Sequence, residues 1–220
     1  QLSNGKGASL RADDSLLRHQ WLVAADLDGK TREATIYLAA QVDIADIEHD
    51  LAHLIHTSEE ASWDDTRGTI VARRIRKLGE LVLEEKELAK PDPALIQQGL
   101  LNAIRSKGLA SLPWTDTTSQ WCARVKLLAT VFPDEWPDVT EKTLFATLEE
   151  WLLPFLTGMQ RWSDLKTLSL TEVLNGLLTY PQQQQLNLLA PTTLTIPTGQ
   201  NVRLDYTAEN GPVLAAKLQA

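Results

Sequence analysis

The chain contains very little cysteine and no long apolar segment. Cys122 is the only cysteine among the 220 residues, which excludes an internal disulfide and is typical of a reducing compartment. No apolar run approaches the ~20 residues that a transmembrane helix needs. Residues 1–17 also lack the apolar core of a signal peptide. We therefore expect a cytoplasmic chain with no membrane partner, in which residues 1–17 form a domain junction.

Positive charge is scarce as well. The sequence has 21 Lys and Arg against 29 Asp and Glu, a formal net charge of -8 at pH 7. This excess of acid argues against a protein whose whole surface binds nucleic acid. Hydrophobic residues make up 43% of the chain, which is enough for a sizeable core in one or two domains.

The C-terminal half carries the clearest periodic patterns. Apolar residues at three- and four-residue spacing predict one helical face that starts near Thr140 and stops by Gly158. These residues are Leu144, Leu148, Trp151, Leu152 and Phe155. A second periodic run, residues 165–178, is predicted to end at Tyr180-Pro181, because the residue before a proline disfavours the helical conformation. The four glutamines that follow, residues 182–185, are predicted to be a polar linker.

A strand-like pattern comes next. Residues 194–196 and 202–206 are β-branched and apolar, and they flank a Pro/Gly turn at residues 197–200. We therefore expect residues 181–220 to hold a terminal β-hairpin and the start of a truncated helix.

Residues 18–90 are predicted to form a small β-rich module with one helix. The expected strands are residues 21–25, 31–39, 60–64, 69–78 and 81–87, and Asp28-Gly29 is a hairpin signal. Residues 43–56 place their apolar side chains on one helical face, with Asp43 as the N-cap. Pro91 and Pro93 interrupt any regular element and mark a boundary.

Residues 91–180 are predicted to be a helical segment. Helices are expected at residues 94–107 and 118–131, in addition to the two periodic runs already described. Short connections between these helices favour antiparallel packing. The predicted fold class is therefore α+β.

Several strings resemble those of the HrpB-type bacterial ATP-dependent helicases, which are relatives of the DEAH-box RNA helicases. The strings are WLLPFLTG (151–158), APTTLTIPTG (190–199), LDY (204–206), PVLAAKLQ (212–219), WLVAADLD (21–28), GTIVARRIRKLGELVL (68–83) and WPD (136–138). Together they cover nearly the whole chain, and they resemble the C-terminal region of that family. The resemblance implies an excised fragment whose partner is the missing helicase core of the same chain. It also implies that ATP hydrolysis belongs to the parent protein, since the family's nucleotide motifs lie upstream of this region.

One string is similar to a phosphate-binding loop. Residues 24–31, AADLDGKT, fit a relaxed P-loop pattern with alanine in place of the first glycine. A phosphate cradle needs a loop that opens a helix, so that backbone N–H groups converge on the phosphates. Here Asp26 and Asp28 would repel an anion, and a strand pattern follows. We therefore favour a hairpin turn and predict no cofactor in this fragment.

A second pattern is typical of zinc ligands. His49 and His53 stand one turn apart in the predicted helix, which would suit a shared metal. A third ligand is needed, and His56 lies about 60° round the helix from His53. The alternative is the solvent-facing side of an amphipathic helix, which we favour, so no metal is predicted.

Cysteine and tryptophan offer weaker signals. Cys122 has no histidine near it in the sequence, which favours a buried structural thiol over a nucleophile. Trp121 and Trp151 lie on apolar helical stripes and are predicted to be core residues. The tryptophans near element ends could either pack or stack on bases, with packing favoured: Trp63, Trp114, Trp136 and Trp162.

One segment departs from the acidic average. Residues 67–79 contain no acid and five cations, which are Arg67, Arg73, Arg74, Arg76 and Lys77. These side chains are candidates for contact with the phosphates of single-stranded RNA or DNA. The alternative is that they pair across the predicted hairpin with Glu84, Glu85 and Glu87.

The sequence therefore leaves two functions open. The first is a non-catalytic accessory region of a helicase that supports nucleic-acid binding or packs on the helicase motor. The alternative is a protein-interaction or scaffolding domain without a nucleic-acid role. A free-standing hydrolase would need a catalytic site, and no catalytic residues are predicted.

Overall fold

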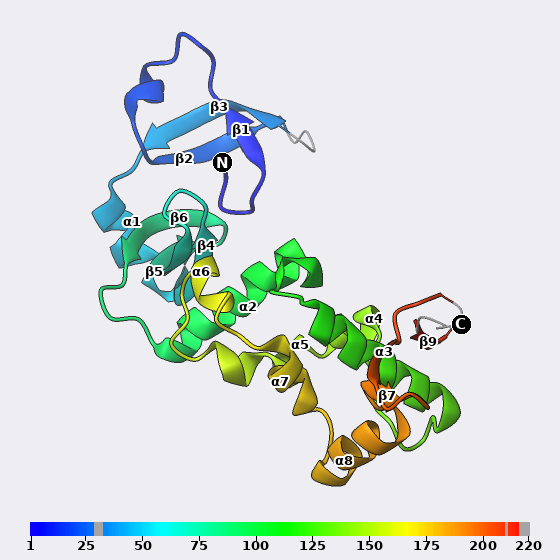
Figure 1. The fold of residues 1–220 in the computed structure, drawn as a ribbon. Coiled ribbons are helices and arrows are strands. Elements are labelled where there is room, and N and C mark those ends of the chain that lie inside the picture. Colours follow the sequence, from blue (N-terminus) through cyan, green and yellow to red (C-terminus); the bar gives the residue numbers. More distant parts are fainter. Residues whose placement is uncertain (29–32, 210, 216–220) are drawn as a thin grey trace. The chain divides into compact units, whose positions relative to one another are not determined.

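The computed structural model describes residues 1–28, 33–209 and 211–215 (Figure 1). The chain divides into two compact units. Unit 1 comprises Gln1–Ala61 and Val71–Pro91, and unit 2 comprises Ser62–Ile70 and Asp92–Ala220. Strands lie mainly within residues 7–87 and 193–214 and helices mainly within residues 93–189, which confirms the predicted α+β class. Within the described ranges, no helix is long and apolar enough to cross a membrane.

The first sheet of unit 1 has the strand order β1-β3-β2. Its strands are β1 (Gly7–Ser9), β2 (Leu22–Leu27) and β3 (Glu33–Gln41), and a 3₁₀ helix, η1 (Ser15–Arg18), precedes β2. Strand β3 runs antiparallel to β2 and parallel to β1. The two predicted strands are thus confirmed, whereas Gly29 of the predicted turn lies outside the described residues.

Helix α1 (Ile44–Asp50) is shorter than the sequence pattern predicts. Asp43 occupies the N-cap position, but the helix ends at Leu51. A 3₁₀ helix, η2 (Ala52–Leu54), follows, and strand β4 starts at Ile55. The prediction of one helix through residue 56 is therefore wrong. The helical spacing of the apolar residues concealed a strand start, where Ile55 and Thr57 are β-branched and suit a pleated sheet.

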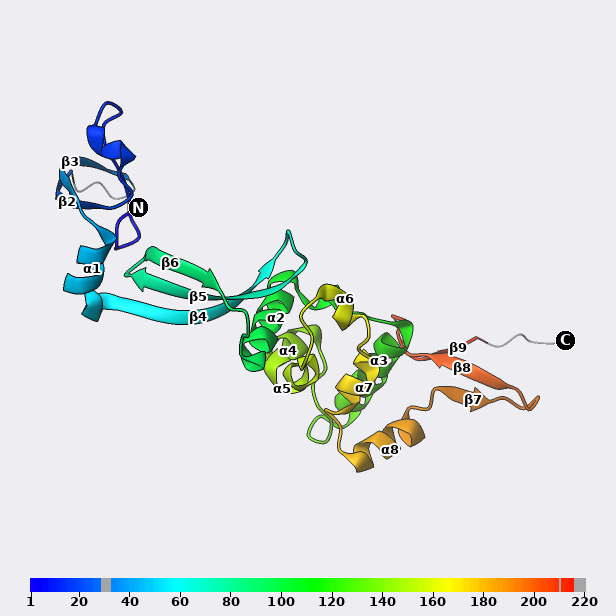
Figure 2. The same cartoon turned by 90° about the vertical axis from the view of Figure 1, so that its left-hand side faces the viewer.

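The second sheet has the order β4-β5-β6, drawn as a three-stranded ribbon in Figure 2. Its strands are β4 (Ile55–Asp64), β5 (Thr69–Leu78) and β6 (Leu81–Glu87), and the last two match the predicted bounds. The tight β5–β6 turn depends on Gly79, which has φ +58. A Cβ at this position would lie 2.1 Å from the carbonyl oxygen of Ser3, so the close approach of the two backbone segments requires glycine.

Unit 2 is built around two long helices, α2 (Pro93–Lys107) and α3 (Asp116–Val131), with a 3₁₀ helix, η3 (Leu109–Ser111), between them. Asp92 caps α2 by accepting a hydrogen bond from the N–H of Ala94, and Gly108 ends the helix with φ 82. The apolar faces of the two helices supply much of the core. Its fully buried members here include Leu100, Leu101, Ile104 and Val125.

The run predicted as one helix from Thr140 is broken into three short elements. These are α4 (Glu141–Ala146), α5 (Leu148–Trp151) and the 3₁₀ helix η4 (Leu153–Leu156). The break falls at Thr147, whose hydroxyl donates to the carbonyl of Thr143 at 2.8 Å. The predicted apolar face is nevertheless largely confirmed. Leu144, Leu148, Trp151 and Leu152 are buried, and only Phe155 is exposed.

The second periodic run forms α6 (Trp162–Leu165) and α7 (Leu170–Asn175), and it is followed by α8 (Tyr180–Leu189). The predicted helix end at Tyr180-Pro181 is wrong, because α7 ends at Asn175 and Tyr180-Pro181 starts α8. The predicted glutamine linker is also wrong, because residues 182–185 lie in α8. Thr179 and Gln182 form a capping box, in which the backbone N–H of Thr179 donates to Oε1 of Gln182 at 2.8 Å. Proline is well tolerated in this first turn because its missing N–H would have no partner there.

The chain ends in a small sheet of order β7-β8-β9. Its strands are β7 (Thr193–Thr195), β8 (Asn201–Asp205) and β9 (Val213–Leu214). Leu194 lies opposite Val202, which confirms the predicted hairpin. The sequence predicts the start of a helix in this last segment, but Val213–Leu214 form strand β9. Residues 216–220 lie outside the described residues.

Candidate nucleic-acid interface

The five candidate cations lie on one continuous hairpin. Arg67 is in the turn between β4 and β5, and the other four side chains follow along β5. The turn is shaped by Asp64, whose Oδ1 accepts hydrogen bonds from the N–H groups of Thr66 and Arg67 at 3.0 Å each. The β-branched start of β5, Thr69 to Val71, then favours an extended strand.

Two of the cations pair with glutamates of the neighbouring strand β6. Arg76 lies directly opposite Glu84, and Nη1 of Arg76 is 3.3 Å from Oε2 of that residue. Nε of Arg73 is 3.1 Å from Oε1 of Glu85. The alternative interpretation of the sequence, in which these cations pair across the hairpin, is thus confirmed for Glu84 and Glu85.

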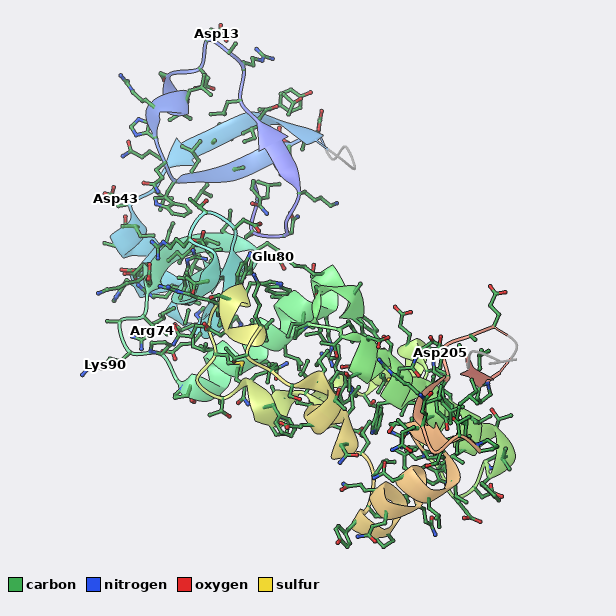
Figure 3. All side chains as sticks on the ribbon, viewed as in Figure 1. Asp13, Asp43, Arg74, Glu80, Lys90 and Asp205 are labelled. Carbon is green, nitrogen blue, oxygen red and sulfur yellow. The ribbon has the colours of Figure 1, made fainter. Side chains whose placement is uncertain are left out.

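Further carboxylates approach from segments that the sequence did not suggest. Glu59 on β4 accepts two hydrogen bonds from Arg74, at 2.8 and 3.1 Å. Arg74 is labelled in Figure 3. Glu48 on α1 lies 2.5 Å from Nη1 of Arg76, and the hydrogen bond to Glu48, followed by the one to Glu84, raises the pKa of Arg76 above its ordinary value. Glu59 lies on β4 because this strand starts at Ile55, whereas the sequence predicts a strand only from residue 60.

The remaining two cations have looser acidic neighbours. Nζ of Lys77 is 3.8 Å from Glu60, and Nε of Arg67 is 3.8 Å from Asp64. The side chains of Arg67 and Arg74 are still 53% and 55% exposed. All five cations therefore have a carboxylate within 4 Å, so the positive charge of this segment is compensated locally.

The string similar to a phosphate-binding loop lies partly outside the described residues, because residues 29–32 are not described. Its described part ends strand β2 and continues to Asp28, whose Oδ1 accepts a hydrogen bond from the N–H of Thr35 at 3.0 Å.

The three histidines considered as metal ligands do not share one helix. His49 is on α1, His53 on η2 and His56 on β4, so the helical spacing that suggested a shared metal does not apply.

Trp63 and Trp162 pack against each other within unit 2. Their ring centroids are 5.4 Å apart at an interplanar angle of 76°, an edge-to-face arrangement. The ammonium of Lys107, at the end of α2, lies 5.1 Å from the ring centroid of Trp63 and 4.7 Å from that of Trp162. Nearby, the N–H of Ile70 donates to the carbonyl of Gln160 at 2.9 Å. These contacts fasten the β4–β5 turn to the helices of unit 2.

Buried polar side chains on α3 hold the C-terminal elements. Arg124, only 6% exposed, donates to the carbonyls of Ala190 at 2.6 Å and Leu186 at 3.1 Å, and to Oδ1 of Asn187 at 2.8 Å. The guanidinium thereby satisfies carbonyls at the C-terminal end of α8 and lies at the negative end of the helix dipole. Burial lowers the pKa of Arg124. Sequence periodicity places Arg124 on α3 but gives no sign of this role.

Gln120 makes the second link from α3 to the hairpin. Its Nε2 donates to Oδ1 of Asp205 at 2.6 Å, and its Oε1 accepts from the N–H of Tyr206 at 2.9 Å. Asp205, labelled in Figure 3, also accepts from the hydroxyl of Thr207 at 2.6 Å. These hydrogen bonds, the one from Thr207 foremost, lower the pKa of Asp205 to about 2.

A hollow of about 450 Å³ lies beside α3. Cys122 and Trp114 line it, as do Lys126 and Tyr206. Cys122 is 8% exposed, and burial raises the pKa of its thiol to about 11, so the reactive thiolate is scarce at neutral pH. Trp114 donates its indole N–H to the carbonyl of Leu109 at 2.7 Å.

Of the other tryptophans, three are buried: Trp121, Trp136 and Trp151. This confirms the prediction that Trp121 and Trp151 are core residues.

These observations define an α+β region: a β-rich module whose cations pair with nearby carboxylates, followed by a helical unit with a terminal hairpin. Comparison with known proteins places the region in a family. Residues 54–88 match the family described as ATP-dependent RNA helicase HrpB, connector region, and residues 151–220 match ATP-dependent helicase C-terminal. The chain is a connector and C-terminal region of the HrpB type, which confirms the resemblance inferred from the sequence.

One curated relative and two solved structures support the assignment. The chain is 39% identical over 222 residues to ATP-dependent RNA helicase HrpB of Escherichia coli (strain K12), covering 100% of the chain and 27% of that protein. It is similar to the crystal structure of E. coli DExH-box NTPase HrpB, with TM-score 0.60, 39% identity and coverage of 99% of this chain. It also resembles that of Escherichia coli DEAH/RHA helicase HrpB, with TM-score 0.60, 36% identity and 98% coverage. The chain spans about 27% of the length of these relatives.

Proposed function

We propose that this chain is the non-catalytic accessory part of an ATP-dependent RNA helicase, and that it acts by packing on the helicase core. The family matches and the 27% coverage of the relatives support a role beside a motor that this chain does not contain. Nucleotide binding and hydrolysis then belong to that motor. The isolated chain takes no cofactor in this proposal.

The observation that carries the proposal is the pairing of the connector cations. Each of the five candidate side chains has a carboxylate of its own unit or turn within 4 Å. A nucleic-acid phosphate brought to this strand would meet those carboxylates as well as the cations, and like charges repel. Pairing within the sheet therefore favours a structural role for the cations over RNA contact.

A second candidate function is contact with single-stranded RNA or DNA. It is favoured by Arg67 and Arg74, whose side chains are more than half exposed despite their acidic neighbours. In this alternative, the two arginines exchange their carboxylate partners for phosphates. Affinity would then fall with salt at a slope of about -0.7 per phosphate contact.

A titration with single-stranded RNA at several salt concentrations distinguishes the two candidates. Because the net charge is -8, we expect no saturable RNA binding even at low salt. We expect the double variant Arg73→Ala/Arg76→Ala to lose stability without a change in RNA affinity. The matched control is Arg203→Ala, which removes an exposed arginine that pairs with Asp116.

Two results would contradict the proposal. The first is saturable RNA binding whose salt slope is flattened by one to two units when Arg67 and Arg74 are replaced by alanine. The second is ATP hydrolysis by the chain itself, or saturable ATP binding that is lost on changing Lys30. Lys30 lies outside the described residues, so this second test depends on the sequence alone.

A further inference from the structure

A long stretch of unit 2 carries no charge. None of the thirty consecutive residues 173–202 is Asp, Glu, Lys, Arg or His, although 23% of the whole chain is charged. At that average, about seven charged residues would be expected in a stretch of this length. The stretch contains α8 and β7, and both have exposed side chains. A solvated surface normally carries charges, so their absence here needs a reason.

Helix α8 buries Leu186, which is 2% exposed, but it also turns two other leucines towards solvent. Gln183 points inward and donates to the carbonyls of Asn175 at 3.0 Å and Leu178 at 3.1 Å. Leu188 and Leu189 point outward and are 78% and 50% exposed. If the helix served only to pack on unit 2, Leu186 would be expected to be buried, as it is, but Leu188 and Leu189 would not be expected on the solvent side.

The outward side chains form a continuous line, which we call the α8 stripe and define as Tyr180, Gln184 and Leu188. The four-residue spacing places them on one face of the helix. Nε2 of Gln184 donates to Oη of Tyr180 at 2.6 Å, which confirms that these two side chains lie together. Tyr180 is 72% exposed. A hollow of about 360 Å³ beside the stripe is lined by Tyr180, Gln183, Gln184 and Asn187.

The chemistry of the stripe limits what it can bind. Phosphates of RNA or lipid headgroups need cations, and neither the stripe nor the rest of residues 173–202 supplies one. Depletion of charge together with an exposed tyrosine is instead typical of the core of a protein interface. The complementary surface must also be largely uncharged, because a charge buried against the stripe would have no partner.

We propose that the α8 stripe is a docking surface for an uncharged, apolar patch on the helicase core of the same polypeptide. This rests on the proposed function, and the coverage of the relatives supports it: the chain spans only 27% of their length, so most of an HrpB-type protein is available to cover the stripe. In this proposal, helix α8 makes a protein contact through its outer face. Its inner face is fixed to unit 2 by the hydrogen bond from Gln183 to the carbonyl of Asn175 and by the one from Arg124 to the carbonyl of Leu186.

Side-chain footprinting tests the proposal directly. Hydroxyl radicals label exposed side chains, and the labelling of Tyr180 and Leu188 is compared between the 220-residue chain and the full-length helicase that carries it. We expect the labelling of both residues to fall at least fivefold in the full-length protein. Val131, which is 59% exposed at the end of α3, serves as the matched control and should be labelled equally in both.

Substitution then tests the energetic role. The preceding helicase part of the same polypeptide is expressed separately and titrated with the 220-residue chain. Tyr180→Ser/Leu188→Ser should weaken the association about a hundredfold, since interface anchors of this kind are each worth about tenfold or more. Val131→Ser should leave it unchanged. Both variants replace exposed side chains, so circular dichroism should show unaltered folding.

The outcomes separate the two proposals. If the helicase part binds the chain but neither footprint nor affinity depends on the stripe, the α8 stripe is not the docking surface and the proposed function stands. If the helicase part does not bind the chain at all, the proposed function fails as well. Two further results would overturn the stated occupant: concentration-dependent dimerisation of the chain that the double variant abolishes, and protection of the stripe by single-stranded RNA.

Discussion

Replacing Arg124 by methionine should be one of the most destabilising single changes in unit 2. The guanidinium is 6% exposed and donates three hydrogen bonds, two to carbonyls at the end of α8 and one to Asn187. Methionine fills a similar volume but donates none of these bonds. The carbonyl of Ala190 then loses the donor at 2.6 Å, whereas the carbonyl of Leu186 keeps the backbone N–H of Ala190. Each buried acceptor that loses its partner costs about 1–3 kcal/mol.

One effect opposes this loss. A buried guanidinium is poorly solvated, as its lowered pKa indicates, and methionine removes that desolvation cost. Leu186 keeps a backbone donor and Asn187 is exposed to water, so the lost hydrogen bonds less this gain leave a net fall of about 2–4 kcal/mol in the free energy of unfolding. That is a large share of the roughly 5–15 kcal/mol available to a typical domain.

Urea denaturation followed by circular dichroism measures the effect. Arg105→Met is the control, because Nη1 of Arg105 makes a surface ion pair with Glu149 at 3.0 Å and both side chains are at least one-third exposed. That change should cost no more than about 1 kcal/mol. The reasoning is refuted if Arg124→Met and Arg105→Met shift the urea midpoint equally, since the three hydrogen bonds would then contribute nothing beyond a surface pair.

Three further predictions concern other polar contacts of unit 2. The pKa of Asp205 is lowered to about 2, mainly by the hydroxyl of Thr207, against ~3.9 in an unfolded chain. The contribution of this carboxylate to stability is therefore present above pH ~4 and is lost as the pH falls towards 2. The urea midpoint should drop between pH 5 and pH 2.5, and it should drop less in Asp205→Asn. Cys122, whose pKa burial raises to about 11, should react with a thiol reagent at pH 8 only after urea is added; rapid labelling of the native chain would contradict this. Lys107→Gln should lower the free energy of unfolding by about 0.5–1 kcal/mol and alter the fluorescence of Trp63, and an unchanged spectrum would show that the ammonium does not sit over the rings.

Much of the fold follows from local sequence signals. The sequence predicts the β5–β6 hairpin to the residue and the two long helices to within two residues, because glycines and regular apolar spacing mark these elements. The failures have specific causes. The start of α8 was missed because Tyr180-Pro181 was interpreted only as a helix stop, although Thr179 and Gln182 have the spacing of a capping box.

The candidate interface shows a deeper limit. The five cations were found from composition, and two cross-strand partners could be named because Glu84 and Glu85 lie on the adjacent predicted strand. Glu48 could not be named, because its approach to Arg76 depends on how α1 packs against the sheet, which no local pattern encodes. Whether these arginines bind nucleic acid stays a prediction, to be decided by the titration described above.

The two units are interleaved along the chain, which has a practical consequence for anyone who wishes to express either one alone. Cutting at Pro91, where the sequence suggests a boundary, would separate Ser62–Ile70 from the unit to which it belongs. The C-terminal product would lose Ile70, which is 3% exposed, together with Trp63 of the aromatic pair. Its partner Trp162 and the carbonyl of Gln160 would be uncovered. To keep unit 2 intact, residues 62–70 would have to be joined to Asp92 by a short designed linker. This linker would replace Val71–Pro91, the segment of unit 1 that contains β5 and β6.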